Sequence, residues 1–311
     1  MCRISKNGVG WFRSKVQKMW LNRRQRTPRI TYNTAMSKIK AIISDADGTL
    51  VNTIYLIRHG QYEAAVTYLT ARGIHRHEIP SYEVYESYIN KSVGGSTRET
   101  FEKTLNLIFR NTHQEILKSI DFDELDNSLA PIQDHIAPLY VHPFHGLTEL
   151  FTWLGASKTS FGIFTSGNRR MIIRNFGVSL PVMGYTDLFH ADDIALGERL
   201  SAFIARAKAV YGIPELGVIT CEDVTKTKPD PEGILQLMDK FKVAKDEVVV
   251  LGDHPVDIQA AHAAGLAAIG ISHGFSTPAE LREAGAIHIV DDIASLPKLI
   301  ETHNSGQSKL F

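Results

Sequence analysis

Ala41-Ile-Ile-Ser-Asp-Ala-Asp-Gly-Thr-Leu50 is the stretch of sequence that decides the fold. Its apolar start is typical of a short buried strand, and Gly48 ends that strand in a tight turn. Asp45 and Asp47 therefore leave the carboxyl end of a strand, where open α/β sheets bind their ligands. Alternation along the strand points both carboxylates the same way. One acid here could be a plain turn or helix cap, but no structural need explains two.

Three later segments add polar groups in the order that one mechanism would need. Phe161-Gly-Ile-Phe-Thr-Ser-Gly167 is a second short apolar strand that ends in a threonine and a serine. Lys228-Pro-Asp-Pro231 places a lysine before a proline pair that could open a helix. Val248-Val-Val-Leu-Gly-Asp-His-Pro-Val-Asp257 is a third buried strand, followed by two carboxylates.

Together these four motifs resemble those of the haloacid dehalogenase superfamily. The resemblance runs from about Ile39 to about Ile300. Its last part, residues 260–296, is similar to the branch of the phosphoglycolate phosphatases and β-phosphoglucomutases. It implies an α/β fold, with a Rossmann-like doubly wound parallel sheet and an inserted α-helical cap domain. The alternation of strands and helices after Pro143 independently favours a parallel sheet with helices on both faces.

The resemblance implies that the chain is a phosphoric monoester hydrolase that works through an aspartyl-phosphate. Asp45 would be the nucleophile, and Asp47 would protonate the leaving alcohol and then deprotonate the attacking water, because one group cannot do both jobs. A phosphomutase of the β-phosphoglucomutase type shares that intermediate and stays an alternative. A non-catalytic binding module would predict the loss of Asp45 or Asp253, and both are present.

Three carboxylates beside a phosphate require a cation, since each like-charged pair at ~4 Å costs about 4 kcal/mol at an effective dielectric constant near 20. Hard oxygen ligands favour Mg²⁺ over Zn²⁺. By the resemblance, Asp45 and Asp253 would bind Mg²⁺ through carboxylates and Asp47 through its backbone carbonyl. Asp257 would act through water or hold Lys228.

The resemblance also assigns the groups that bind the phosphate. Thr165, with the amides of Ser166 and Gly167 after it, would hydrogen-bond the phosphoryl oxygens, and Lys228 would neutralise the developing charge. Lys226 is the alternative lysine, but the Pro-Asp-Pro that follows Lys228 favours the latter.

Residues 54–142 have helical periodicity at 61–69, 100–109 and 125–139, and we expect them to form the cap. The core would then comprise residues 37–53 and 143–311. Within the cap, Lys91-Ser-Val-Gly-Gly-Ser-Thr-Arg-Glu-Thr100 resembles a substrate-specificity loop, in which Gly95 permits a close approach and Arg98 could clamp a substrate anion. The same segment could form a helix N-cap with Glu99 in the first turn, and the two roles can coexist. The segment 176–199 is long for its place and could form a hairpin or lobe.

Composition limits the remaining possibilities. The chain has 311 residues and two cysteines, so it has no disulfide framework, and we expect a reducing, cytoplasmic setting. No apolar stretch approaches the ~20 residues of a membrane span. Residues 1–40 hold eleven Lys or Arg and no acid, whereas the rest carries a net charge of −11. The basic extension 1–36 could be disordered, or, as residues 1–35, an organellar transit peptide, and a membrane-surface helix is a further alternative.

The expected partner is a small phosphorylated metabolite. A nucleic acid does not suit the acidic body of the chain, and the oligomeric state, monomer or dimer, stays open. Arg58-His-Gly60 matches the string of the histidine phosphatases, whose histidine is the nucleophile. Here the string falls inside an expected cap helix, so we interpret it as coincidence.

Overall fold

The structure is a computed structural model that describes residues 37–92, 96–111, 114–180 and 195–307. The basic extension 1–36, Gly95 and residues 181–194 of the long segment lie outside the described residues. Within the described ranges, no helix combines the length and the apolar character that a membrane crossing needs.

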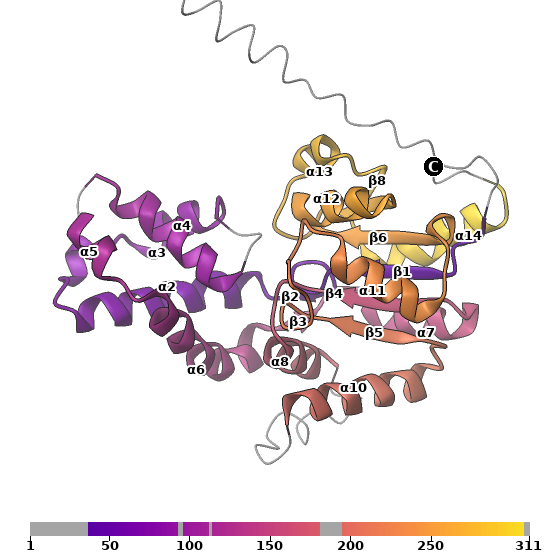
Figure 1. The fold of residues 1–311 in the computed structure, drawn as a ribbon, viewed down its shortest axis with the longest axis horizontal. Helices are drawn as coiled ribbons and strands as arrows, with labels where there is room; N and C mark the ends of the chain where they lie inside the picture. The colour runs from indigo at the N-terminus through magenta and orange to yellow at the C-terminus, as the bar shows by residue number, and fades with distance from the viewer. Residues whose placement is uncertain (1–36, 93–95, 112–113, 181–194, 308–311) are drawn as a thin grey trace, which may run out of the picture. The chain divides into compact units, whose positions relative to one another are not determined.

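A parallel sheet of six strands forms the centre of the α/β core (Figure 1). Its order is β5-β4-β1-β6-β7-β8, which is the order of the doubly wound dinucleotide-binding folds. The predicted fold class is confirmed. The order reverses between β1 and β6, and ligands of such sheets bind at that point, outside the carboxyl ends of the strands. The strands are β1 (Ala41–Ser44), β4 (Ser160–Phe164), β5 (Leu216–Ile219), β6 (Val248–Gly252), β7 (Ala267–Ile271) and β8 (His288–Val290).

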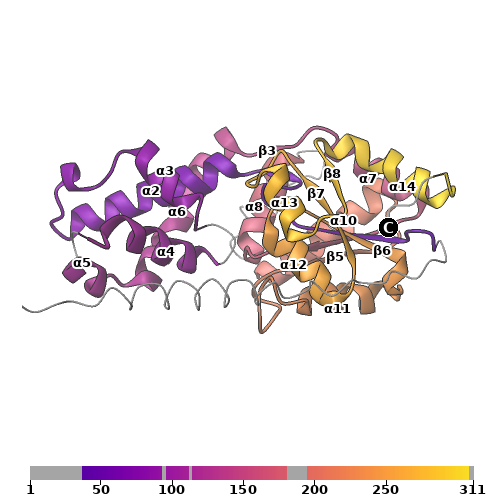
Figure 2. The same ribbon diagram turned by 90° about the horizontal axis from the view of Figure 1, so that it is seen from above.

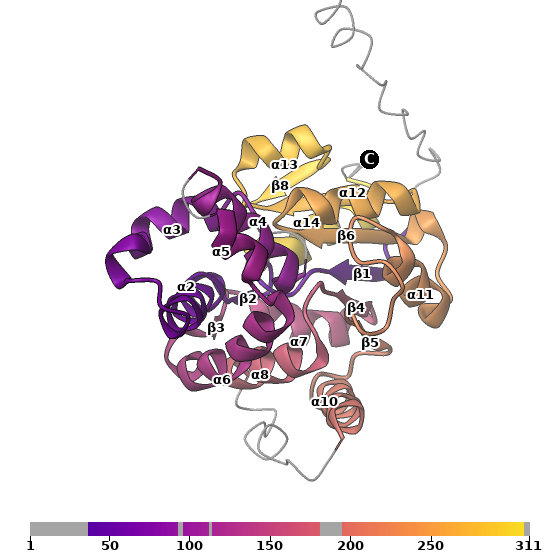
Figure 3. The same cartoon turned by 60° about the vertical axis from the view of Figure 1, so that its left-hand side comes forward.

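Helices cover both faces of this sheet, as Figures 2 and 3 show. Ile42 packs into the apolar cluster on one face, while Ala41 and Ile43 pack into the cluster on the other. This burial on both sides explains why the strands are continuously apolar rather than alternating. The first face is covered by α7 (Leu147–Ser157), α8 (Arg169–Ser179), α10 (Leu196–Tyr211) and α14 (Leu296–Asn304). The second is covered by α11 (Glu232–Phe241), α12 (Pro255–Ala264) and α13 (Pro278–Ala284).

The cap helices follow one another between the short antiparallel strands β2 (Val51–Asn52) and β3 (His142–Pro143) (Figure 1). They have a core of their own, in which Tyr85, Phe101 and Leu125 are fully buried. The predicted helical insertion is thus present, although the predicted domain limits stay a prediction. The cap elements are α2 (Ile54–Ala71), α3 (Tyr82–Ile89), α4 (Thr97–Phe109), α5 (Gln114–Ser119), α6 (Phe122–Tyr140) and the short 3₁₀ helix η1 (Arg76–Glu78). Two further 3₁₀ turns, η3 (Lys245–Glu247) and η4 (Ile293–Ser295), belong to the core.

Candidate active site

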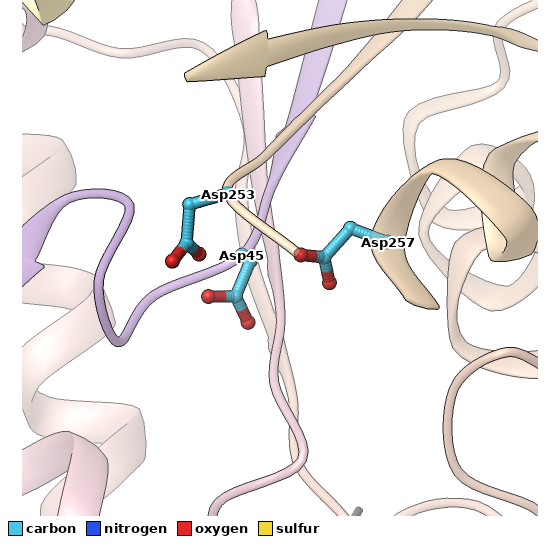
Figure 4. Close-up of side chains that lie close together, drawn as sticks. All are labelled: Asp45, Asp253 and Asp257. Atoms are coloured by element: carbon cyan, nitrogen blue, oxygen red, sulfur yellow. The ribbon is translucent and has the colours of Figure 1, made fainter. Parts of the chain in front are cut away.

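Three carboxylates converge at the carboxyl edge of the sheet, as Figure 4 shows. Asp45 follows β1, Asp253 follows β6, and Asp257 lies in the first turn of α12. One oxygen of each lies within 4.8 Å of the others, and all three side chains are buried. The pairing of Ser44 with Leu251 aligns the ends of β1 and β6, so the two strands deliver their aspartates to one place.

Hydrogen bonds fix the orientation of Asp253. The hydroxyl of Thr49 donates to its Oδ1 at 2.7 Å, and the amide of Phe275 donates to its Oδ2 at 2.7 Å. Gly48 lies in the turn between β1 and β2, where its φ is +85°. A Cβ at this position would lie 2.5 Å from Asp253 Oδ2. Glycine is therefore required at this turn, both for its backbone conformation and for the close approach.

Lys228 lies at the centre of the site. Its Nζ donates to Asp45 Oδ1 at 2.5 Å and to Asp257 Oδ1 at 2.7 Å. Burial alone would lower the pKa of the Lys228 ammonium, but the charges of Asp257 and Asp45 raise it, so this cation stays charged. The second oxygen of Asp257 accepts a hydrogen bond from the amide of His254 at 3.0 Å. Both carboxylate oxygens of Asp257 therefore accept a hydrogen bond from the protein.

The cluster carries more negative charge than Lys228 balances. Burial raises the pKa of Asp45 to about 6, although the charge of Lys228 opposes the shift. Burial, and then the charges of Asp45 and Asp257, raise the pKa of Asp253 well above its usual range. Buried carboxylates of this kind are stable as anions only beside further positive charge. Their oxygen donors and charge fit a hard divalent cation such as Mg²⁺.

Asp47 has a separate set of partners. Its Oδ1 accepts a hydrogen bond from Asn175 Nδ2 at 2.7 Å, and the Asn175 oxygen in turn accepts from Arg174 Nε at 2.9 Å. Arg174 is only 1% exposed, and its NH1 donates to Gln133 at 3.1 Å and to Asp134 at 3.3 Å, both on cap helix α6. Burial, and then the charge of Asp45, raise the pKa of Asp47 to about 6. A buried chain of polar groups thus joins the cap to Asp47.

The loop after β4 supplies further polar groups to the site. Thr165 is buried, and its hydroxyl accepts the amide of Gly167 at 2.9 Å. Asn168 then caps α8 through the amide of Met171 at 2.9 Å. Thr165, Ser166 and Gly167 line the same cavity of about 90 Å³ as Asp45, Asp47, Lys228, Asp253 and Asp257.

The cap contributes to this cavity, but not through the predicted residue. Arg98 lies on α4, where it pairs with Asp123 at 2.7 Å and with Glu102 at 3.4 Å, outside the lining of the cavity. Ser96 caps α4 through the amide of Glu99, which is the N-cap role that the sequence also predicts. The cap residues that do line the cavity are Ile57, Gln61, Thr97, Thr100 and Gln133.

Four core residues of the site have no counterpart among the predicted site residues. His254, Met171 and Phe275 line the cavity, and Asn175 contacts Asp47. A signal for Asn175 existed, because Arg174 and Asn175 are polar residues that interrupt an apolar run between Ile173 and Phe176. His59 of the histidine-phosphatase string lies on α2, stacks on Tyr55 and pairs with Glu63, outside the lining of the cavity.

Comparisons with known proteins agree with this arrangement. The family model described as a haloacid dehalogenase-like hydrolase matches residues 39–265. The phosphoglycolate phosphatase of Rhodospirillum rubrum is 34% identical over 97 residues, which make up 31% of this chain and 40% of that protein. The phosphoglycolate phosphatase of Thiobacillus denitrificans is 23% identical over 265 residues, 84% of this chain and 96% of that protein. A crystal structure of a hydrolase from Pseudomonas syringae, 22% identical, matches 84% of this chain and 98% of that one with a TM-score of 0.57, a likeness of fold.

Proposed function

The chain belongs to the haloacid dehalogenase-like hydrolase family, and we therefore propose that it is a Mg²⁺-dependent phosphatase acting on a small phosphate monoester. The position of Asp45 carries the proposal. Its carboxylate lies on the cavity wall, bonded to Lys228 and close to Asp253, while Asp47 stands two residues further along the same loop.

In the first half of the reaction, an oxygen of Asp45 attacks phosphorus and the bond to the leaving oxygen breaks. Asp47 gives its proton to that oxygen, so the alcohol leaves neutral and Asp47 becomes an anion. A pKa of about 6 suits Asp47 to both giving and taking a proton near neutral pH. Lys228, held against Asp45, offsets the charge that gathers on the phosphoryl group.

In the second half, water attacks the phosphorus of the aspartyl-phosphate and Asp47 takes its proton. The bond between phosphorus and Asp45 breaks, inorganic phosphate leaves, and both aspartates return to their starting states. Thr165 and the amides of Ser166 and Gly167 are the groups that we assign to the phosphoryl oxygens. All three residues line the cavity beside Asp45.

Asp45 and Asp253 would hold Mg²⁺ with their carboxylates, and Asp47 would hold it with its backbone carbonyl. Asp257 would act through water, which suits a carboxylate whose two oxygens already accept from Lys228 and His254. When bound, the ion neutralises charge on the phosphoryl oxygens and on the aspartates around them.

Two alternatives find less support. A phosphomutase must hold a second phosphate while the first sits on Asp45, yet among the cap residues that the structure describes, those that line the cavity carry no charge. Water is therefore the better acceptor. A binding module without activity has no need of Asp45, Asp253 and Lys228 in one buried cluster, which is unfavourable for stability.

The test is phosphate release from sugar, nucleotide and carboxylate phosphates by the purified full chain, with and without Mg²⁺. Asp45→Asn should abolish turnover, because it removes the attacking charge at nearly constant shape. His59→Ala is the matched control and should keep full activity. Activity that survives Asp45→Asn but disappears in His59→Ala would identify His59, and not Asp45, as the nucleophile.

A further inference from the structure

Within the described part of the cap, the side chains that line the cavity are uncharged. Gln61 comes from α2, Thr97 and Thr100 from α4, and Gln133 from α6. Among the lining residues that the structure describes, Lys228 is the one lysine or arginine, and it is already bonded to Asp45 and Asp257. The wall that must receive the leaving group of a substrate therefore offers dipoles and no positive charge.

Gln61 is a residue of this wall whose side-chain oxygen lacks a hydrogen-bond partner among the described residues. It is 2% exposed, and its Oε1 makes no hydrogen bond within the described protein. A buried polar atom without a partner is unfavourable, and such atoms in native proteins call for an explanation. A substrate group that donates a hydrogen bond would satisfy this oxygen. A carboxylate or a second phosphate has no such donor when fully ionised, and would place its charge against an acceptor.

Gln133 supplies the opposite polarity beside Gln61. Its Oε1 accepts from Arg174 NH1 at 3.1 Å, and because a guanidinium only donates, this contact fixes the amide orientation. The NH₂ group of Gln133 is thus the end that is left to donate. Helices α2 and α6 pack closely here, since a Cβ on Gly60 would lie 3.0 Å from Gln133 Cγ. Acceptor and donor together match a hydroxyl, which can both give and receive a hydrogen bond.

Two arginines of the cap, Arg98 and Arg58, have acidic partners, although Nε of Arg58 makes no hydrogen bond within the described residues. Arg98 is paired with Asp123 and Glu102. Arg58 donates to Glu86 at 3.1 Å, and its guanidinium lies over the ring of Phe275, 5.7 Å from the centroid. Neither arginine is part of the lining.

We propose that the substrate is the monophosphate of a small uncharged alcohol that carries at least one further hydroxyl, and that Gln61 and Gln133 bind this hydroxyl. The inference rests on the proposed phosphatase function and narrows it. It separates this chain from enzymes that act on phosphorylated carboxylates or bisphosphates, because those substrates need a cation at this wall.

Three esters of nearly equal size test the proposal with the full chain and Mg²⁺. Ethyl phosphate, 2-hydroxyethyl phosphate and 2-phosphoglycolate differ at one end, which is a methyl, a hydroxymethyl or a carboxylate group. We expect kcat/KM for the hydroxyethyl ester to exceed that for each of the others by about tenfold or more. Equal values for the ethyl and hydroxyethyl esters, or a preference for the carboxylate, would overturn the proposal.

Variants assign the effect to residues. Gln61→Leu keeps the bulk of the side chain but removes its dipole, so the ratio of hydroxyethyl to ethyl ester should fall toward one. Gln236→Leu, an exposed glutamine on α11, is the matched control and should keep both rates. A preference for 2-phosphoglycolate that Arg58→Gln removes would instead assign a substrate cation to Arg58. If even p-nitrophenyl phosphate is not hydrolysed, the failure is that of the phosphatase function itself.

Discussion

Asn175 Nδ2 lies 2.7 Å from Oδ1 of Asp47. Because the Asn175 oxygen accepts from Arg174, the amide can only present its donor to Asp47. Oδ1 of Asp47 is therefore held as an acceptor, and Oδ2 is left for proton exchange. Oδ2 faces the loop after β4, since a Cβ on Gly167 would lie 3.5 Å from it. The contact thus orients the carboxyl group that we propose as the acid and base.

Asn175→Ala should slow the cleavage of an alkyl phosphate more than that of p-nitrophenyl phosphate. An alkoxide needs its proton from Asp47, whereas nitrophenolate leaves without one. We expect a loss of about tenfold to a hundredfold for the alkyl ester, which is at or below the lower limit of what a general acid contributes, because the variant misorients Asp47 without removing it. Single-turnover release of each alcohol, before the aspartyl-phosphate breaks down, measures this difference.

Asn106→Ala, an exposed position on α4, serves as the control and should change neither rate. If Asn175→Ala slows both esters equally, the contact supports the fold of α8 and not the proton transfer.

Chelation of divalent ions should abolish phosphate release, and Mg²⁺ should restore it. Ca²⁺ should restore less, because its looser coordination positions the nucleophile poorly. Asp253→Asn should raise the Mg²⁺ concentration needed for half-maximal rate or eliminate turnover, since it removes a buried carboxylate from the cluster. Titrating the rate with Mg²⁺ in both proteins checks this. Full turnover in the presence of a chelator would disprove the metal requirement.

The metal-free protein should become more stable as the solution is acidified. Asp47 has a pKa of about 6 in the folded chain against an ordinary value of 3.8, so folding takes up a proton within that window. Stability then rises as pH falls from above 6 toward 3.8, by on the order of 3 kcal/mol for this group. Urea unfolding with a chelator, at about pH 5 and about pH 8, measures the difference.

In the Asp47→Asn variant residue 47 cannot titrate. The difference between the free energies of unfolding at the two pH values should therefore be smaller in this variant. Mg²⁺ should stabilise the wild-type protein more at the higher pH, where the carboxylates are charged. A metal-free protein that is more stable in alkali than in mild acid would contradict the cause that we assign to the raised pKa.

Removal of residues 1–36 should leave the rate of phosphate release unchanged in vitro. The described residues that line the cavity fall between Asp45 and Phe275, and the first described contacts to the core begin at Ser37. A truncation that also removes residues 37–40 is the contrasting variant, because it deletes the hydrogen bond from the Ile39 amide to Asn304 and the pairing of Lys40 with Glu247. Loss of activity in the shorter truncation would show that the extension contributes to the folded core.

The parts of the site that lie at strand ends could be predicted from sequence. Apolar runs that end in Asp45, Thr165 or Asp253 identify both a strand and its carboxyl end, and parallel pairing brings those ends together. The cap was harder to predict. Helical periodicity predicts α4, but Thr97 lines the cavity while the adjacent Arg98 pairs with Asp123. Which side of the helix meets the core depends on tertiary packing that no local pattern contains.

Strand β1 is synthesised early, yet it occupies the middle of the sheet. Ala41 pairs with Ser160 on one side and with Val248 on the other. Strand β1 therefore cannot complete its pairing until β4 and β6, which are synthesised much later, have left the ribosome. The cap core comes from one continuous stretch of chain and can collapse sooner. Until β6 is made, β1 presents an open edge that can template aggregation. During refolding, the return of hydrolysis should therefore be the slowest signal, and it should lag behind the burial of the cap tyrosines.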